Sequence, residues 1–215
     1  MHTHPLWRPF ELPDADAIRA ARLRPDDASR WRRPVVVSAY DPDWTTRFGR
    51  VAGLISAALT SNALSVEHVG STAVPGLAAK PVIDIDLLVA DSSDEASYVP
   101  RLEAEGFILV VRQPEWEEHR LLRLTAPETN LHVFSAGAVE PHRHLRFRDW
   151  LCTHLADRDA YAALKLKLAA TGFDDVMLYN NAKSALIYDF YESIFAADPQ
   201  HLHTPRPRVS AASGS

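Results

Sequence analysis

The sequence predicts an α+β protein in which a mixed β-sheet is flanked by helices and followed by a C-terminal helical part. Two observations predict this fold class. Short apolar runs with strand character alternate with helical periods in the first two thirds of the chain, and from about residue 142 onward the pattern is helical alone. The 215 residues are 47% hydrophobic, which is ordinary for a globular protein with one large core.

Strands are expected where apolar residues alternate or cluster, at residues 35–40, 65–69, 82–90, 107–112, 119–126 and 130–136. Helices are expected where apolar residues recur at helical spacing, at 14–23, 45–61, 92–106, 143–155, 158–170 and 180–197. We therefore divide the chain into an N-terminal extension or linker (1–34), a core (35–141), a C-terminal helical part of the same domain (142–197) and a disordered tail (198–215).

Composition excludes several classes of protein. The net charge of −5 and the pI of about 6.0 argue against general nucleic-acid binding, because no overall basic field attracts phosphates. No apolar run reaches the roughly 18 to 20 residues of a membrane span, so no membrane partner is expected. The single cysteine, Cys152, cannot form an internal disulfide. The N-terminus lacks the order of a signal peptide, and we expect a cytoplasmic protein.

An unusual strand lies within residues 66–89, which read VEHVGSTAVPGLAAKPVIDIDLLV. Because side chains alternate along a strand, Asp84 and Asp86 share one face, with Cα atoms about 7 Å apart. Two like charges side by side in a sheet are costly unless a cation lies between them. Oxygen ligands favour Mg²⁺ or Mn²⁺, so the pair is a candidate metal site.

The GST turn precedes this strand by about a dozen residues. Gly70 permits close backbone approach, and Ser71 and Thr72 offer hydroxyl and N–H donors, as a phosphate site requires. A lone GST is more often an ordinary turn, and a lone D-x-D often an exposed strand end. Together, with Lys80 between them to neutralise a phosphate, they predict a site for phosphoryl or nucleotidyl transfer.

The stretch EHVGSTAVPGLAAKPVIDIDLLV closely resembles the signature of the GrpB family, a largely uncharacterised group in the nucleotidyltransferase superfamily. Later blocks of that family are matched by YDPDW (40–44), NLHVF (130–134), HLRFRDWL (144–151) and YAALKLKLA (161–169). The resemblance covers about residues 35–197. A related domain is fused to some actinobacterial dephospho-CoA kinases, although this sequence contains no G-x-x-x-x-G-K-[ST] P-loop.

The resemblance implies a nucleotidyltransferase-like core that binds a nucleoside triphosphate with Mg²⁺ or Mn²⁺. Gly70 and Ser71 would hold phosphates, and Asp84 and Asp86 would bind the metal and act in catalysis. Active relatives commonly carry a third carboxylate on a nearby strand, where this sequence offers His132, which could act as a base or a ligand.

Further residues have a functional and a structural interpretation. Arg148 could bind a phosphate bidentately, or brace a helix through Asp149. Lys183 is the candidate phosphate ligand of the C-terminal helices, whereas Lys165 and Lys167 are expected on a solvated helix face. His68 is expected to be structural. The cluster HRH at 142–144 lacks a cysteine or acidic partner at metal-ligand spacing and is not favoured as a metal site.

Three functions follow from these expectations. The first is a nucleotidyltransferase that transfers a nucleotidyl group to an unknown acceptor. The second is a catalytically inactive nucleotide-binding or regulatory module of the same fold, which the missing third carboxylate favours. The third is a repurposed enzyme that adenylates a carboxylate or amine in a specialised pathway.

Overall fold

The computed structural model describes residues 2–12, 14–23, 34–173 and 176–208. Its centre is a five-stranded sheet in the order β1-β2-β5-β4-β3. The strands are β1 (Ser65–Val69), β2 (Ile83–Val89), β3 (Ile108–Gln113), β4 (His119–Leu124) and β5 (Thr129–Ser135). Only β2 and β5 pair in parallel, and the other neighbours are antiparallel, so the mixed sheet is confirmed.

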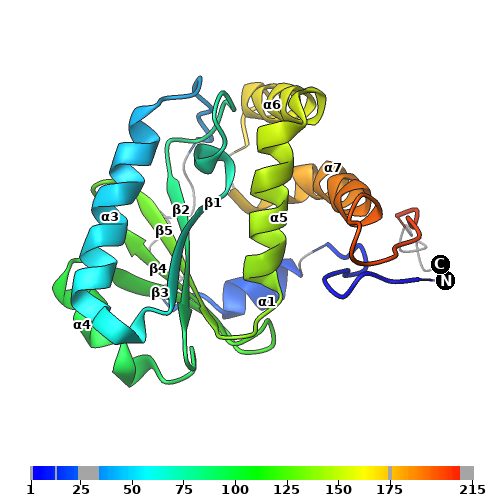
Figure 1. Cartoon of the computed structure of the whole chain (residues 1–215). Helices are drawn as coiled ribbons and strands as arrows, with labels where there is room; N and C mark the ends of the chain where they lie inside the picture. The colour runs from blue at the N-terminus through cyan, green and yellow to red at the C-terminus, as the bar shows by residue number, and fades with distance from the viewer. Residues whose placement is uncertain (1, 13, 24–33, 174–175, 209–215) are drawn as a thin grey trace.

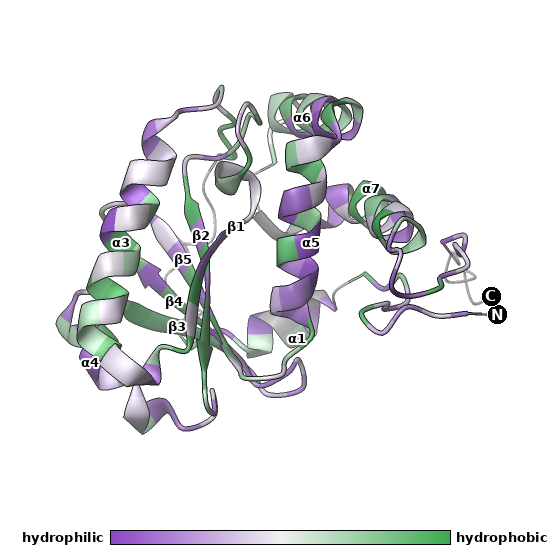
Figure 2. Ribbon diagram, viewed as in Figure 1, coloured by the Kyte–Doolittle hydropathy of each residue, from purple (hydrophilic) through white to green (hydrophobic). Residues whose placement is uncertain are grey.

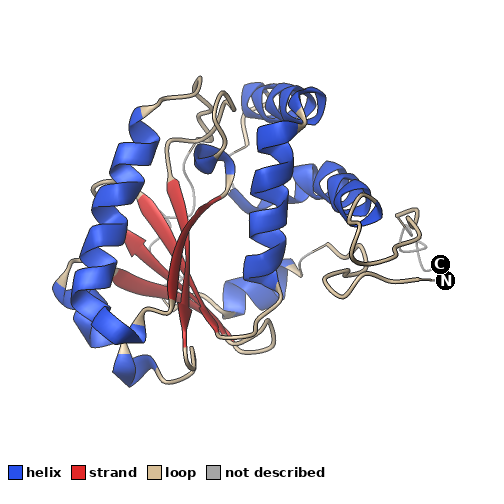
Figure 3. Ribbon diagram, viewed as in Figure 1, coloured by secondary structure: helices blue, strands red, loops and turns tan. Residues whose placement is uncertain are grey.

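Helices cover both faces of the sheet (Figures 1 and 3). The helices α3 (Asp43–Leu59) and α4 (Val99–Ala104) lie on one face, and α5 (Glu140–Thr153) runs along the other. Two further helices, α6 (Leu155–Ala170) and α7 (Val176–Ala196), pack against each other and against α5. The short helix α1 (Ala15–Ala20) is capped by the Asp14 side chain. The predicted α+β class, with helices flanking a mixed sheet, is therefore confirmed.

The alternation of β2 decides what each face of the sheet contains. Ile83, Ile85, Leu87 and Val89 all lie in the main core, together with Val51 and Ile55 of α3 and Leu102 of α4. Because the intervening residues point the other way, Asp84 and Asp86 face the side that α5 covers. The helix α5 is largely hydrophilic, as Figure 2 shows, which suits a face that carries charges.

A second core joins the loop after β1 to the C-terminal helices. Val74 and Leu77 of that loop pack with Leu151 of α5, Tyr161 of α6 and Phe190 of α7. Gly76 lies against the Arg158 guanidinium, and Arg158 donates a hydrogen bond to the Pro75 carbonyl at 3.2 Å. The helical part therefore holds the GST turn in place.

Two expected elements differ in the structure. Residues 35–40 form no strand but a single bridge between Ser38 and Ala79, because their partner is the irregular loop that precedes β2. The helix expected at 92–106 is broken into a short 3₁₀ turn (Glu95–Ser97) and α4. Pro100 lies in the first turn of α4, where its ring and missing N–H prevent a continuous helix from Ser92.

The described N-terminal and C-terminal segments, residues 2–8 and 198–208, meet beside α7 (Figure 1). Where we expected a disordered tail from residue 198, the structure gives residues 198–208 a defined course. His203 Nε2 lies 2.8 Å from Glu192 Oε2 of α7, and Trp7 Nε1 donates to Glu192 Oε1 at 2.7 Å. The expected disorder of residues 209–215 lies outside the described residues. Among the described helices, none combines the length and the apolar character that crossing a membrane requires.

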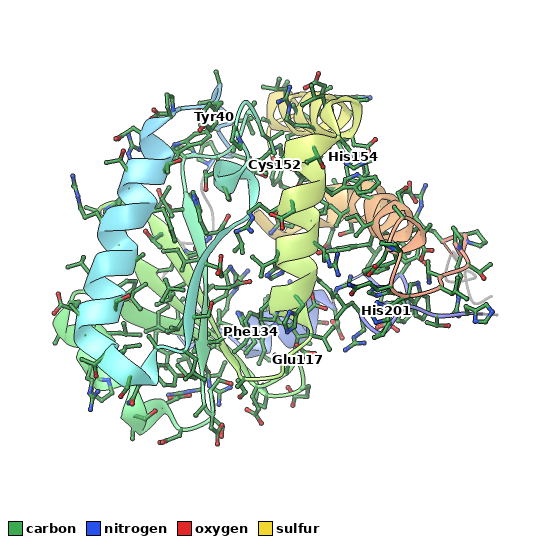
Figure 4. The ribbon with its side chains drawn as sticks, in the orientation of Figure 1. Tyr40, Glu117, Phe134, Cys152, His154 and His201 are labelled. Carbon is green, nitrogen blue, oxygen red and sulfur yellow. The ribbon has the colours of Figure 1, made fainter. Side chains whose placement is uncertain are left out.

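The helix α5 begins on a carboxylate from the β3–β4 connection. Glu117 Oε2 accepts hydrogen bonds from the backbone N–H groups of Val139 at 2.9 Å and Glu140 at 3.0 Å. Figure 4 shows Glu117 at this end of α5, with Cys152 and His154 at the other. The contact stabilises the N-terminus of the helix in the manner of a cap.

We expect Glu117→Ala to lower the free energy of unfolding by about 1–2 kcal/mol, because it leaves two N-terminal donors of α5 without this acceptor. Chemical denaturation monitored by circular dichroism measures the change. The exposed neighbour Glu115 serves as the control, and Glu115→Ala should be nearly neutral. Equal effects of the two substitutions would contradict the capping role.

Candidate functional site

The GST turn lies directly against the first aspartate of the D-x-D pair. Val69, the last residue of β1, is in register with Asp84 of β2, so the chain leaves β1 beside that carboxylate. Gly70 has φ +69, and a Cβ added to it would lie 2.6 Å from Asp84 Oδ2. Ser71 then opens a 3₁₀ turn (Ser71–Ala73). A glycine is required here both by the backbone conformation and by the closeness of the carboxylate.

The two carboxylates are held by different neighbours. Asp84 Oδ1 accepts a hydrogen bond from Asn130 Nδ2 at 2.8 Å, and Asn130 is its register partner on β5. Asp86 Oδ2 lies 2.8 Å from His144 Nδ1 of α5. Asp86 is only 2% exposed, and its Oδ1 has no hydrogen-bond partner among the described residues. An unsatisfied, buried carboxylate oxygen beside a second carboxylate fits a cation ligand.

His144 supplies positive charge to this pair. Burial by itself lowers the pKa of His144, but the charge of Asp86 and the hydrogen bond to it outweigh burial and raise that pKa above its ordinary value. The ring is therefore protonated to a greater extent than a free imidazole at the same pH, and its protonated form donates Nδ1–H to Asp86 Oδ2. His144 thus compensates one carboxylate charge within a largely buried site.

A chain of side chains runs across the sheet to His132. His132 is the register partner of Asp86, and its Nδ1 lies 3.0 Å from His119 Nε2. His119 Nδ1 lies 2.9 Å from Gln113 Oε1. Burial is the main cause that lowers the pKa of both histidines, so both are neutral near pH 7. Because the amide oxygen can only accept, His119 carries its proton on Nδ1 and accepts from His132 Nδ1–H. This leaves His132 Nε2 as a proton acceptor.

Three lysines lie within electrostatic reach of Asp84. Lys80 precedes β2, Lys165 lies on α6 and Lys183 on α7. Burial is the largest cause that lowers the pKa of Lys165 and of Lys183 to about 7, and it lowers that of Lys80 as well. Lys165 is 2% exposed, and its Nζ has no hydrogen-bond partner in the described part of the chain. Lys165 was expected to be solvated, and the structure corrects this expectation, whereas Lys167 is exposed as expected.

The other turn residues have defined partners. The Ser71 side chain lies close enough to the buried Tyr161 of α6 to oppose the rise that burial causes in the pKa of Tyr161. Thr72 donates its hydroxyl proton to the Val82 carbonyl at 3.2 Å and lies 3.1 Å from His68 Nε2. His68 is buried and stacks on Phe48, and burial is the main cause that lowers its pKa to about 4. These hydrogen bonds of Thr72 with His68 and with the Val82 carbonyl therefore attach the turn to β1 and to the segment before β2.

Arg148 braces α5 against β1. Its Nη1 donates to the His68 carbonyl at 3.0 Å and to Glu67 Oε2 at 3.3 Å, and its Nε donates to Asp149 at 2.8 Å. These contacts match the structural interpretation of the Arg148–Asp149 pair. The guanidinium lies near the start of the GST turn but is already committed to three acceptors.

Several residues of the site were not assigned to it from the sequence. Asn130 lies two positions before His132 on a predicted strand, so alternation alone could have placed it on the same face. His144 and Tyr161 lie on helices whose docking onto the sheet no local pattern reveals. His119 resembles any histidine at the start of a strand until its hydrogen bonds are known.

Comparison with known proteins decides the family. The family model described as GrpB protein matches residues 34–193. This chain belongs to the GrpB family. It is 47% identical to a UPF0157 protein of Halalkalibacterium halodurans over 172 residues, which cover 80% of this chain and 86% of that protein. The crystal structure of the conserved GrpB protein from Enterococcus faecalis superposes with a TM-score of 0.59 at 27% identity, over 73% of this chain and 99% of that one.

Two more distant similarities concern proteins with named activities. A dephospho-CoA kinase of Mycolicibacterium paratuberculosis is 28% identical over 186 residues, which cover 74% of this chain and 46% of the kinase. This confirms the predicted relation to a part of such kinases. The Cid1 poly(U) polymerase aligns with a TM-score of 0.45 at 15% identity, over 63% of this chain and 44% of the polymerase.

The contact between Gly70 and Asp84 can be tested by comparing two glycines. Gly70 and Gly137 both have positive φ, but a Cβ on Gly137 would meet nothing within 4 Å. We expect Gly137→Ala to cost about 1 kcal/mol of unfolding free energy from backbone strain alone. Gly70→Ala should cost about 1–3 kcal/mol more, because its Cβ would displace the Asp84 carboxylate.

Denaturant titration of both variants gives the comparison. The difference between the two costs isolates the clash from the backbone strain. Equal costs would show that Asp84 moves aside freely, and the turn would then not be fitted to that carboxylate.

Proposed function

We propose that this chain is a nucleotidyltransferase that binds a nucleoside triphosphate with Mg²⁺ or Mn²⁺ and transfers a nucleotidyl group to an acceptor. One observation carries the proposal: Gly70 lies in close contact with Asp84, in a site that contains two carboxylates and the desolvated amines of Lys165 and Lys183. Carboxylates suit a divalent cation and amines suit phosphates, and a nucleoside triphosphate–metal complex presents both. A cytoplasmic location is part of the same proposal.

The residues present fit a divalent cation. Asp84 and Asp86 share one face, and the Oδ1 atom of Asp86 is buried without a partner among the described residues. Mg²⁺ is commonly held by one or two carboxylates and completes its coordination with water and substrate phosphates, so two protein ligands suffice. When bound, the cation would neutralise charge on the triphosphate.

The phosphates would be held by the turn and by the lysines. Gly70 lies against Asp84, and Ser71 opens the turn that follows it. Lys80, Lys165 and Lys183 come from the loop before β2, from α6 and from α7, and each interacts electrostatically with Asp84. Burying amines near one another is unfavourable, and a triphosphate with several negative charges would relieve that cost. These contacts would orient the α-phosphate toward the acceptor.

His132 would take the place of the third carboxylate. Its Nε2 is the free acceptor at the end of the Gln113–His119–His132 chain. In the transfer, an acceptor hydroxyl would give its proton to His132 Nε2, its oxygen would form the new bond to the α-phosphorus, and pyrophosphate would leave. His119 would act by positioning the ring of His132.

The second candidate is a regulatory nucleotide-binding module without transfer. The match to part of a dephospho-CoA kinase favours it, since the matched segment there belongs to a longer protein with another named activity. Both candidates require nucleotide binding at the same residues. Turnover with an acceptor separates them.

Metal-dependent nucleotide binding is the first test of the proposal. For the wild type, each nucleoside triphosphate with Mg²⁺ should be compared by its effect on the thermal unfolding midpoint. A ligand at 100 times its Kd stabilises the folded state by about 2.7 kcal/mol, which is readily seen. The double variant Asp84→Asn/Asp86→Asn should lose the Mg²⁺-dependent shift and keep its circular dichroism spectrum.

An undiminished shift in that double variant would remove the central claim. A wild type that responds to no nucleotide would contradict both candidates. Binding without turnover across a broad acceptor panel would favour the regulatory module over the transferase.

The buried lysines predict how affinity depends on pH. Lys165 and Lys183 have pKa values lowered to about 7, chiefly by burial, so they are mostly neutral above that pH. Phosphate binds the protonated amines, and we therefore expect nucleotide affinity to fall as pH rises from 7 to 8.5, with proton uptake on binding. Isothermal titration calorimetry in buffers of different ionisation enthalpy measures both.

Two substitutions provide the control. Lys165→Met should weaken binding about tenfold or more and reduce the pH dependence, because it removes a cation from a dry site. Lys167→Met alters an exposed lysine of the same helix and should change neither. Equal behaviour of the two variants would place the phosphates elsewhere.

A further inference from the structure

The meeting point of the two chain ends contains three potential metal ligands. The atom at its centre is Asp198 Oδ2, which lies 3.0 Å from His4 Nε2 and 3.3 Å from His201 Nδ1. The three ligand atoms all lie within 4.8 Å of one another. His201 is labelled in Figure 4, beside the N-terminal segment. All three residues lie outside residues 34–193, so the GrpB match does not include them.

The local geometry is compatible with a small divalent cation. A tetrahedral centre with bonds of about 2.0 Å places its ligand atoms about 3.3 Å apart, close to the two separations observed. The side chains of His4 and Asp198 are 2% and 4% exposed. Asp198 Oδ1 accepts from the Gln200 N–H at 2.9 Å, which fixes the carboxylate and leaves Oδ2 toward the histidines.

An adjoining cavity gives the centre an open side. Its volume is about 420 Å³, and its lining includes His4, His201, His142, Arg146 and Asp149. His142 belongs to the HRH cluster, whose members the fold separates, because His144 turns to Asp86. Water from this cavity would complete a four-coordinate centre.

Two existing contacts would have to yield to a cation. Arg146 Nη2 lies 3.3 Å from Asp198 Oδ2, but its side chain is 48% exposed and can turn into solvent. His4 Nδ1 accepts from the Leu6 N–H at 3.0 Å, so the ring proton is on Nε2 and points at Asp198. Metal binding at Nε2 would release that proton or move it to Nδ1, and would loosen the Leu6 contact. The affinity should therefore fall on acidification.

We propose that His4, Asp198 and His201 form a binding site for a divalent transition-metal ion of the Zn²⁺ type, which fastens the two ends of the chain together. Two imidazoles and one carboxylate favour Zn²⁺ over Mg²⁺. The site is separate from Asp84 and Asp86 and independent of the function proposed for them. Its bound ion would stabilise the packing of both terminal segments against α5 and α7.

Titration of the full-length, chelator-treated protein with ZnCl₂ in a calorimeter tests the proposal. We expect one Zn²⁺ per chain, a raised thermal midpoint and no competition from Mg²⁺. Asp198→Asn and His201→Ala should each weaken binding about tenfold or more. His2→Ala, a nearby exposed histidine outside the cluster, is the matched control and should bind as the wild type does.

The binding data for these variants distinguish results that support the Zn²⁺ site from results that overturn it. Loss of affinity in His201→Ala, which alters a largely exposed side chain, supports the site even where Asp198→Asn fails to fold. Zn²⁺ affinity that is absent in the wild type, or that stays within twofold in His201→Ala, overturns the proposal. The Asp84→Asn/Asp86→Asn variant should retain Zn²⁺ binding, and loss there would assign the ion to the sheet instead.

Discussion

The constraint on which the rest of this structure depends is the placement of two carboxylates, buried Asp86 and half-buried Asp84, on one face of β2. Asp86 is almost fully enclosed, and an enclosed carboxylate must find hydrogen-bond donors or a cation. The side chain of His144 on α5 supplies one donor, and Asn130 on the parallel strand β5 supplies another to Asp84. The mostly hydrophilic helix α5 can therefore cover this face, whereas the apolar sides of α3 and α4 cover the opposite one.

The same constraint explains the charges that surround the pair. Lys80, Lys165 and Lys183 come from three separate segments, and each interacts favourably with Asp84 while burial opposes its own charge. A stable core would avoid such a concentration of partly dehydrated ions. Proteins retain buried charges of this kind where a bound ligand compensates them. The ligand that we propose here is a nucleoside triphosphate with a divalent cation.

The parts of the chain differ in how they relate to other proteins. The GrpB match covers the sheet, the GST turn and the three C-terminal helices up to residue 193. The terminal segments outside it form their own contacts. The Glu192 carboxylate is hydrogen-bonded to the side chains of both Trp7 and His203, and the Asp198 carboxylate is hydrogen-bonded to His4. The candidate site thus lies within the part of the chain that matches the family, and the terminal segments lie outside that part.

The sequence alone determined the five strands of the sheet, the shared face of Asp84 and Asp86, and the glycine turn, because these follow from a period of two and from local backbone sterics. It also indicated His132, whose strand neighbours set its face. Only the tertiary structure decided that His144 pairs with Asp86, that Lys165 is buried and that Thr72 supports the turn from beneath. The reason is that a helix's docking depends on the surfaces of distant segments, and local periodicity records which residues share a face but not what that face will meet.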